Sequence, residues 1–296
     1  MDRYREIIPD WEAFWEAIHR PLPTVIRCNT LRVEPEGLRE RLEGKGFRLS
    51  PLPWDEGLFQ VEGEIPIGNT LEHWLGLYYV QEASQTLAVL ALDPQPGERV
   101  LDLCAAPGGK ATQIAQHMRD EGLVVANDPS PKRLRALLAN LYRLGVRCAV
   151  VTECLGEKFP GQGEYDRVLV DAPCSGEGTA RRHPHLRRGA PLGLIRRLAA
   201  LQKRLLCRAL ELVRPGGIVV YSTCTLAPEE NEGVVRYVLD RGLAELLPWE
   251  PPVPHARGLP RFWGEEYGEE LEKAVRIYPH HFDSEGGFVA RLRRPH

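Results

Sequence analysis

Short apolar runs and helical segments alternate along residues 99–223 of this 296-residue chain, and this alternation constrains the fold more than any other feature. The expected strands are 99–103, 123–127, 148–152, 168–170 and 218–223, and the expected helices are 111–118, 131–144 and 192–213. A strand followed by a helix and a parallel strand builds a sheet with helices on its faces. We therefore predict an α/β fold with a doubly wound, mostly parallel sheet. Ligands of such sheets bind outside the carboxyl ends of the strands.

The first 70 residues are expected to form a separate, small unit. Their pattern predicts, in order, a helix at 4–19, a strand at 24–33, a helix at 36–44 and extended pieces at 47–49 and 58–61. This order describes an α+β domain, which would act as an RNA-binding or docking domain or as a lid over apolar surface. We divide the chain into residues 1–70 and a sheet domain at 71–296, which opens with a helix expected at 74–92. Segments near 271–278 and 287–292 are expected to add the last strands.

Composition limits the possible classes of protein. The net charge of −3 and the isoelectric point near 6.3 give no general electrostatic attraction to nucleic acid, so any basic footprint has to be local. The seven cysteines include no C-x-x-C pair, which argues against a disulfide framework and a metal site. The sequence has no apolar run of membrane-spanning length and no signal-peptide pattern at its start. We therefore expect a cytoplasmic protein, most simply a monomer.

A turn of small residues at 104–110 joins the first strand of the sheet domain to a helix. Such turns let backbone N–H groups approach a nucleotide-like ligand. A phosphate-binding P-loop is excluded because Cys104 and Ala111 stand where the pattern requires Gly and Ser or Thr, and G-x-G-x-x-G is absent. Asp128 follows the second strand, where a carboxylate can accept from both ribose hydroxyls. These features together predict S-adenosylmethionine (SAM), which carries adenosine and an amino-acid tail but no phosphate.

Two further strands each end beside a thiol. Cys174 follows the strand at 168–170 in Asp-Ala-Pro-Cys, and Cys224 follows the strand at 218–223. Parallel strands would bring both thiols to the same rim of the sheet. Cytosine C5 accepts a methyl group only after a thiolate has added to C6, and a second thiol can assist the later expulsion of the first as a general acid or base.

Several motifs carry a family resemblance. Residues 102–110 (DLCAAPGGK), 171–178 (DAPCSGEG), 221–225 (YSTCT) and 228–232 (PEENE) resemble the Sun/Nop-type (RsmB/RsmF-like) RNA cytosine-C5 methyltransferases, and most closely their bacterial ribosomal-RNA branch. Residues 27–31 (RCNTL) look like the R-x-N-T-L element of that family. The resemblance covers about 20–296 and implies a Rossmann-like, SAM-dependent methyltransferase sheet.

The resemblance also implies roles for individual residues. Cys224 would be the nucleophile and Cys174 would help to release the product, whereas DNA cytosine methyltransferases attack from the proline-cysteine motif. Asp171 would hold the cytosine edge at N3 or N4, with Lys110 close to the same pocket. The residues expected around the cofactor are Cys104, Ala105, Ala106, Pro107, Gly108, Gly109, Lys110, Asp128 at the ribose, Arg133, Glu153 where the family usually has Asp near the adenine, Asp171 and Pro173.

The clearest local basic run lies at 181–188, directly after the proline-cysteine loop. Such a run usually forms a solvated loop, but beside the predicted pocket it could bind RNA phosphates. The residues expected to contact RNA are Arg27, Arg181, Arg182, Arg187 and Arg188. The target base would have to be exposed or flipped out of its stack.

The sequence therefore predicts a SAM-dependent RNA methyltransferase that forms 5-methylcytosine, with small-subunit (16S) ribosomal RNA favoured as substrate. A tRNA enzyme with the same chemistry and a non-catalytic RNA-binding ribosome assembly factor are the alternatives. The intact Asp171, Cys174 and Cys224 argue against the assembly factor. A small-molecule or protein methyltransferase would not need two cysteines, and an adenine-N6 enzyme would need a D/N-P-P-Y loop, which is missing.

Overall fold

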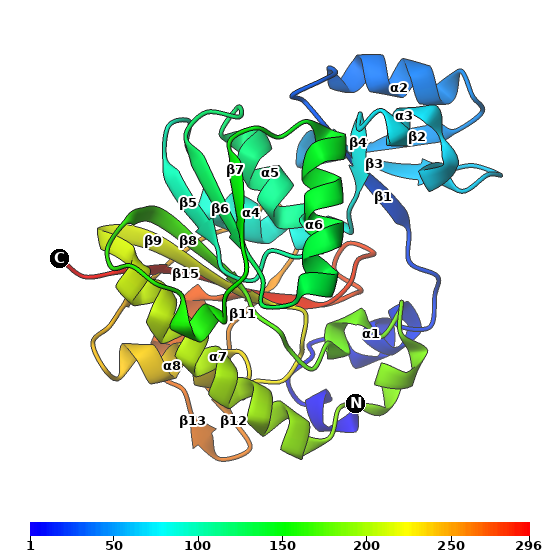
Figure 1. The fold of residues 1–296 in the computed structure, drawn as a ribbon. Coiled ribbons are helices and arrows are strands. Elements are labelled where there is room, and N and C mark those ends of the chain that lie inside the picture. Colours follow the sequence, from blue (N-terminus) through cyan, green and yellow to red (C-terminus); the bar gives the residue numbers. More distant parts are fainter.

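The computed structural model describes residues 1–296 and contains one large mixed sheet of nine strands (Figure 1). Five neighbouring strands are parallel, in the order β9-β8-β5-β6-β7. Their bounds are β5 (Arg99–Asp102), β6 (Leu123–Asn127), β7 (Ala149–Thr152), β8 (Tyr165–Asp171) and β9 (Val213–Thr223). The chain moves outward from β5 to β7 and then returns to β8 on the other side of β5. The strand order therefore reverses between β5 and β8, which is where α/β sheets of this type bind ligands.

Antiparallel strands extend the sheet beyond β9. They are β10 (Glu245–Leu247), β11 (Ala256–Arg257), β14 (Val275–Ile277) and β15 (Gly287–Arg293). β15 pairs with β9 along residues 288–293, and β14 and β10 both pair with β15. The expectation of late strands at 271–278 and 287–292 is confirmed. A separate hairpin consists of β12 (Arg261–Phe262) and β13 (Glu265–Glu266).

Helices cover both faces of the sheet, as the alternating pattern predicted. The helices are α4 (Leu87–Leu92), α5 (Gly109–His117), α6 (Pro131–Leu144), α7 (Leu192–Leu212) and α8 (Glu232–Leu239). Figure 1 shows α5 and α6 on one side and α7 and α8 on the other. Residues Val100 and Val124 pack towards α4 and α5, whereas Leu101 and Val125 pack towards α7 and α8. This alternation follows from the two-residue period of a strand.

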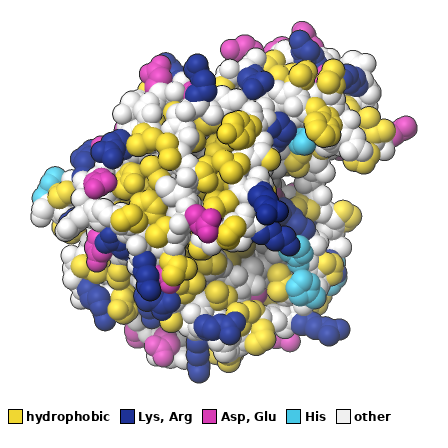
Figure 2. All heavy atoms as spheres, in the orientation of Figure 1, with side chains coloured by type: hydrophobic (Ala, Val, Ile, Leu, Met, Phe, Trp, Pro, Cys, Tyr) yellow, Lys and Arg dark blue, Asp and Glu magenta, His cyan; other side chains and the backbone are white.

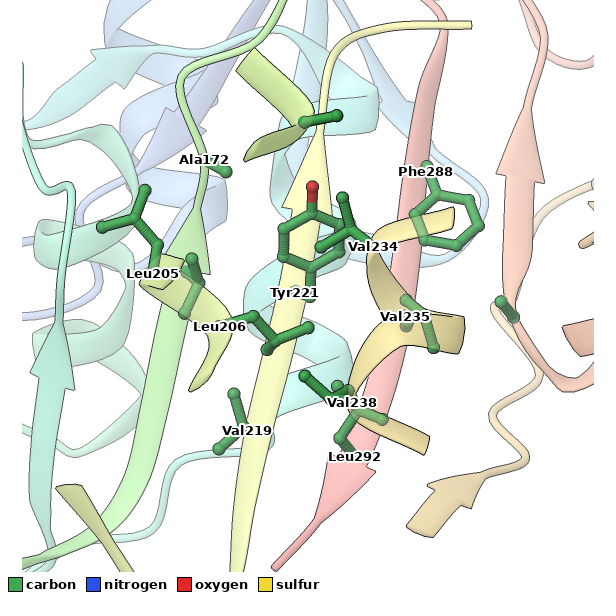
Figure 3. Close-up of a cluster of buried hydrophobic side chains, with 14 of the residues drawn as sticks. Ala172, Leu205, Leu206, Val219, Tyr221, Val234, Val235, Val238, Phe288 and Leu292 are labelled. Carbon is green, nitrogen blue, oxygen red and sulfur yellow. The ribbon is translucent and has the colours of Figure 1, made fainter. Parts of the chain in front are cut away.

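The core beneath α7 and α8 supports the ends of β8 and β9. Figure 3 shows Tyr221 of β9 packed among Leu206, Val234 and Val235, with Phe288 of β15 beside them. The Tyr221 hydroxyl oxygen points towards the carboxyl end of the strand (Figure 3). Because all of these side chains are fully buried, the strand ends are held on a rigid base.

The small N-terminal sheet is antiparallel, with the order β2-β3-β1-β4. Its elements are β1 (Thr24–Cys28), α2 (Pro35–Glu43), β2 (Arg48–Leu52), β3 (Asp55–Glu62), α3 (Leu71–Trp74) and β4 (Tyr78–Val80). Leu38 and Leu42 of α2 pack on Ile26 and Phe59 of the sheet. This sheet extends to Val80, beyond the boundary expected near residue 70.

Two expected helices are wrong in extent. The first is only α1 (Trp11–Ala17), because Pro9 precedes it and Asp10 caps it by accepting from the N–H of Ala13 at 3.0 Å. It packs through Phe14 on the large core, not on the small sheet. The helix expected at 74–92 is interrupted at Gly76, which has a φ of +69° and whose missing Cβ leaves room for the carbonyl of Arg143.

No helix combines the length and the apolar character needed to cross a membrane.

Candidate active site

A crevice of about 490 Å³ opens where the strand order reverses. Its floor includes Asp102 at the end of β5, Asp171 at the end of β8 and Cys224 directly after β9. Residues 22–25 and 79–82 of the N-terminal part form one wall. The crevice therefore collects side chains that are far apart in sequence at the carboxyl edge of the sheet.

The turn of small residues at 104–110, which follows β5, forms one side of the crevice. Cys104, Ala105, Ala106, Pro107, Gly109 and Lys110 all line it, whereas Gly108 does not. Gly108 has a φ of +107° and directs the chain into α5. Asp102 also lines the crevice, and both of its buried carboxylate oxygens lack a hydrogen-bond partner. Burial, with the charge of Asp171, raises the pKa of Asp102 to about 7.

Four other residues expected at the cofactor lie beside the crevice and do not line it. Asp128 is fully buried, and its Oδ2 lies 3.0 Å from Nη1 of Arg133. Arg133 also donates to the carbonyl of Ala106, so its guanidinium covers the carboxylate. Glu153 is exposed and directly follows β7. This strand pairs with β6, the strand that precedes Asp128. Pro173 is exposed, and its carbonyl faces α7.

Lys110 and Asp171 form an ion pair inside the crevice. Nζ of Lys110 donates to Oδ2 of Asp171 at 2.8 Å and to Oε1 of Gln85 at 2.5 Å. Ser222 of β9 donates to Oδ1 of Asp171 at 3.0 Å. Burial lowers the pKa of Lys110, but the Asp171 carboxylate outweighs it and the pKa is raised, so the amine stays charged. The pair thus presents a fixed carboxylate and a fixed cation to a ligand.

The two thiols lie together, as the strand pattern predicted. Sγ of Cys174 is 3.2 Å from Sγ of Cys224. Cys224 lines the crevice, whereas Cys174 does not. The hydrogen bond to Cys224, burial and the nearby charge of Glu230 raise the pKa of Cys174 well above its ordinary value. Cys174 is therefore held as a neutral thiol next to the sulfur that faces the crevice.

Two of the arginines expected to bind RNA are structural, and these predictions are wrong. Arg27 is 3% exposed and donates to Gln81, to the carbonyl of Gly109 at 2.8 Å and to Thr112 at 2.8 Å. Arg181 is 6% exposed and is bound by Asp283 at 2.7 Å and by the carbonyls of residues 20, 21 and 284. Their guanidinium groups join the N-terminal part to the sheet domain, and a phosphate cannot reach them.

The rest of the basic run stays at the surface. Arg182 and Arg188 are exposed and Arg187 is half-buried. Arg182 lines the crevice, with its Nε 3.2 Å from Oε1 of Glu285. Figure 2 shows Lys, Arg and His side chains gathered beside the hollow between the small sheet and the body of the molecule. This part of the surface can attract a polyanion to the crevice.

Sequence reasoning missed several residues that line the crevice, among them Asp102, Gln85 and Glu285. Asp102 had a detectable signal, since a carboxylate at the end of a strand directly precedes the small-residue turn. Gln85 lies in a segment expected to be a regular helix. Glu285 comes from the loop before β15, and burial together with the charge of Glu82 raises its pKa to about 7. No local pattern connects Gln85 or Glu285 with this site.

Comparisons with known proteins agree with this geometry. Residues 89–293 match the family described as 16S rRNA methyltransferase RsmB/F, and residues 1–83 match the N-terminal domain of 16S rRNA methyltransferase RsmF. The chain is 39% identical over 298 residues to the tRNA (cytosine(49)-C(5))-methyltransferase of Pyrococcus abyssi, covering 100% of this chain and 95% of that protein.

A bacterial relative and a solved structure are equally similar in sequence. Ribosomal RNA small subunit methyltransferase F of Vibrio parahaemolyticus is 39% identical over 306 residues, but the match covers only 63% of that protein and 100% of this chain. A methyltransferase homologue from Pyrococcus horikoshii has a crystal structure with a TM-score of 0.85 and 39% identity, covering 99% of this chain and 93% of that one. The chain therefore belongs to the RsmB/F family of RNA cytosine-C5 methyltransferases, which use SAM as the methyl donor.

Proposed function

We propose that this enzyme forms 5-methylcytosine in the ribosomal RNA of the small subunit (16S), by addition of Cys224 to cytosine C6 and release assisted by Cys174. One observation supports the division of roles. The two sulfurs are 3.2 Å apart, and only Cys224 lines the crevice. A nucleophile has to reach the base, whereas a residue that assists its departure has to reach the nucleophile.

The Lys110–Asp171 pair would hold the target base. The Asp171 carboxylate is fixed on both sides, by Lys110 at 2.8 Å and by Ser222 at 3.0 Å. As the Cys224 thiolate adds to C6, negative charge builds up on the N3 side of the ring. A charged Lys110 beside this edge would stabilise that charge, because preorganised groups in a desolvated site act strongly on developing charge.

The residues of the crevice fit SAM, which would supply the methyl group for C5. The Asp102 carboxylate is buried and has no hydrogen-bond partner, so it suits the ammonium of the amino-acid tail. The small side chains of Ala105 and Ala106 leave the backbone accessible. Asp128 would bind the ribose after Arg133 moves aside, and Glu153 would lie near the adenine.

SAM affinity is expected to depend on the protonation of Asp102. With its pKa at about 7, Asp102 is mostly neutral at pH 6 and mostly ionised at pH 7.5, and only the carboxylate attracts the ammonium. Affinity should therefore be up to about tenfold weaker at pH 6. Calorimetric titration of the enzyme with SAM at the two pH values measures this change in affinity.

Asp102→Asn should bind SAM weakly at both pH values. The control is Glu285→Gln, because Glu285 is the other acid of the crevice with a pKa of about 7. This control should keep the pH dependence of SAM affinity seen in the wild type. A wild-type profile in Asp102→Asn would contradict this role.

Two features support an RNA substrate and leave a choice between RNA classes. The exposed Arg182 and Arg188 beside the crevice offer cations for the phosphate backbone. Both family matches are named for 16S rRNA enzymes, which favours ribosomal RNA. The alternative is tRNA, because this chain covers 95% of the archaeal tRNA enzyme but less than two thirds of the bacterial ribosomal-RNA enzyme.

A methylation assay with SAM that carries a tritiated methyl group tests which RNA is the substrate. The purified enzyme is given 16S rRNA, assembled small subunits and tRNA, and bisulfite sequencing locates the product. We expect label in 16S rRNA or in the subunit, at a cytosine that bisulfite leaves unconverted. Label in tRNA alone would favour the tRNA alternative, and binding of RNA and SAM without transfer would favour the assembly factor.

A further inference from the structure

A buried carboxylate lies directly behind Cys174 and takes no part in the reaction described above. Glu230 is 0% exposed and lies in the loop that follows Cys224. Its Oε2 accepts from the backbone N–H of Ser175 at 3.0 Å and from Nε2 of Gln202 at 2.7 Å. The same Nε2 donates to the carbonyl of Pro173 at 2.9 Å. The residues on both sides of Cys174 are thus bound by one pair of side chains.

Two more contacts join the loops of the two thiols. The Ser175 and Thr225 hydroxyls, each next to one of the cysteines, are 2.6 Å apart. The N–H of Gly178 donates to the carbonyl of Cys224 at 2.9 Å. A side chain at Gly178 would collide with this carbonyl, because an added Cβ would lie 2.8 Å from it. The separation of the two sulfurs is therefore fixed from several directions.

Glu230 itself is firmly held although no cation pairs with it. The Tyr221 hydroxyl, which points towards this loop from the core (Figure 3), donates to the carbonyl of Glu230 at 2.5 Å. Both hydrogen-bond partners of its carboxylate, the Ser175 N–H and the Gln202 amide, are neutral. Burying a carboxylate with neutral donors alone is costly. The same two donors also fix the residues on either side of Cys174. Positioning of the Cys174 thiol would therefore explain why a buried carboxylate is present here.

We propose that Ser175, Gln202, Thr225 and Glu230 form a thiol clamp, a set of positioning residues that hold the Cys174 thiol against Cys224. The clamp does not touch substrate and acts only through Cys174. The proposal rests on the proposed function, in which Cys174 assists the release of Cys224 from methylated RNA. Loosening the clamp should then slow release and leave the initial attack by Cys224 intact.

Gln202→Met tests the clamp by removing the amide that donates to Glu230 and to the carbonyl of Pro173. Methionine suits a helix and is close to glutamine in size, but the Glu230 carboxylate then keeps only the Ser175 N–H, so the thermal unfolding midpoint is measured alongside. With SAM and RNA, we expect the covalent enzyme–RNA adduct to form at the wild-type rate but to decay on the order of 10- to 100-fold more slowly. Time courses on a denaturing gel measure both rates. Lys203→Met, the adjacent position on α7, is the matched control and should behave as wild type.

A double variant separates positioning from a general structural effect. Adding Gln202→Met to Cys174→Ala should change neither rate further, because the clamp then has no thiol to position. Additive effects, equal slowing of adduct formation and decay, or wild-type turnover of Gln202→Met would each overturn the clamp while leaving the proposed function intact. If Cys174→Ala alone turns over normally without an adduct, the proposed function fails and the clamp with it. Should Gln202→Met not fold, Ser175→Ala is measured in its place, with the same expected direction.

Discussion

Cys224→Ala is expected to transfer no methyl group to RNA above background, a loss of at least about 10⁴-fold. Without the thiolate, C5 of cytosine stays too weakly nucleophilic to accept a methyl group. Cys174 cannot replace the lost sulfur, because it does not line the crevice and its raised pKa keeps it protonated. Incorporation of tritiated methyl groups into RNA measures the loss.

The variant should otherwise be intact. SAM affinity and the thermal unfolding midpoint should stay close to the wild-type values, because Cys224 is partly exposed and its sulfur has a single hydrogen-bond partner, the Cys174 thiol. Cys207→Ala, on α7 and away from the crevice, is the control for loss of a thiol and should retain full activity. Activity of Cys224→Ala within about tenfold of wild type would exclude this residue as the nucleophile.

Cys174→Ala is expected to trap the enzyme on its RNA. Attack by Cys224 and methyl transfer to C5 still proceed, but the C5 proton has then to leave while the bond between C6 and Sγ breaks. Without the neutral thiol 3.2 Å away, the departing sulfur loses its hydrogen-bond donor. Turnover should fall by about 10²- to 10⁴-fold, and a denaturing gel should show a protein band shifted by the attached RNA.

The origin of the trapped band can be checked directly. Cys174→Ala combined with Cys224→Ala should give no adduct, because the attacking sulfur is gone. Omission of SAM should weaken the band if the adduct accumulates after methylation. A band that persists in the double variant would show that another nucleophile forms it, and the assigned roles of the two cysteines would then be wrong.

The parallel part of the sheet was predictable because its signals are local. The expected strand at 123–127 and helix at 131–144 coincide with β6 and α6. Pro131 at the first turn, Ser130 as the cap and Gly145 in the left-handed conformation determine the limits of this helix. The strand ends then placed Asp171, Cys174 and Cys224 on one rim.

The errors concern residues whose surroundings come from distant parts of the chain. Arg27 and Arg181 carry charges that normally stay in water. Arg27 is buried by its contacts with residues 109 and 112, and Arg181 by its contacts with residues 20–21 and 283–284. Glu285 enters the crevice because β15 inserts beside β9. No periodicity within a window of twenty residues contains such contacts, so sequence patterns could not reveal them.

The pairing of β15 with β9 also matters for the order in which the chain is synthesised. The strand that precedes Cys224 emerges from the ribosome well before residues 287–293, which cover its free side. Until they arrive, β9 is an open edge with apolar neighbours, and exposed edges of this kind invite pairing with other chains. The nascent protein thus passes through an interval in which its future catalytic strand is unprotected. Slow translation of the last segment would lengthen the exposure of this edge to aggregation and to chaperones.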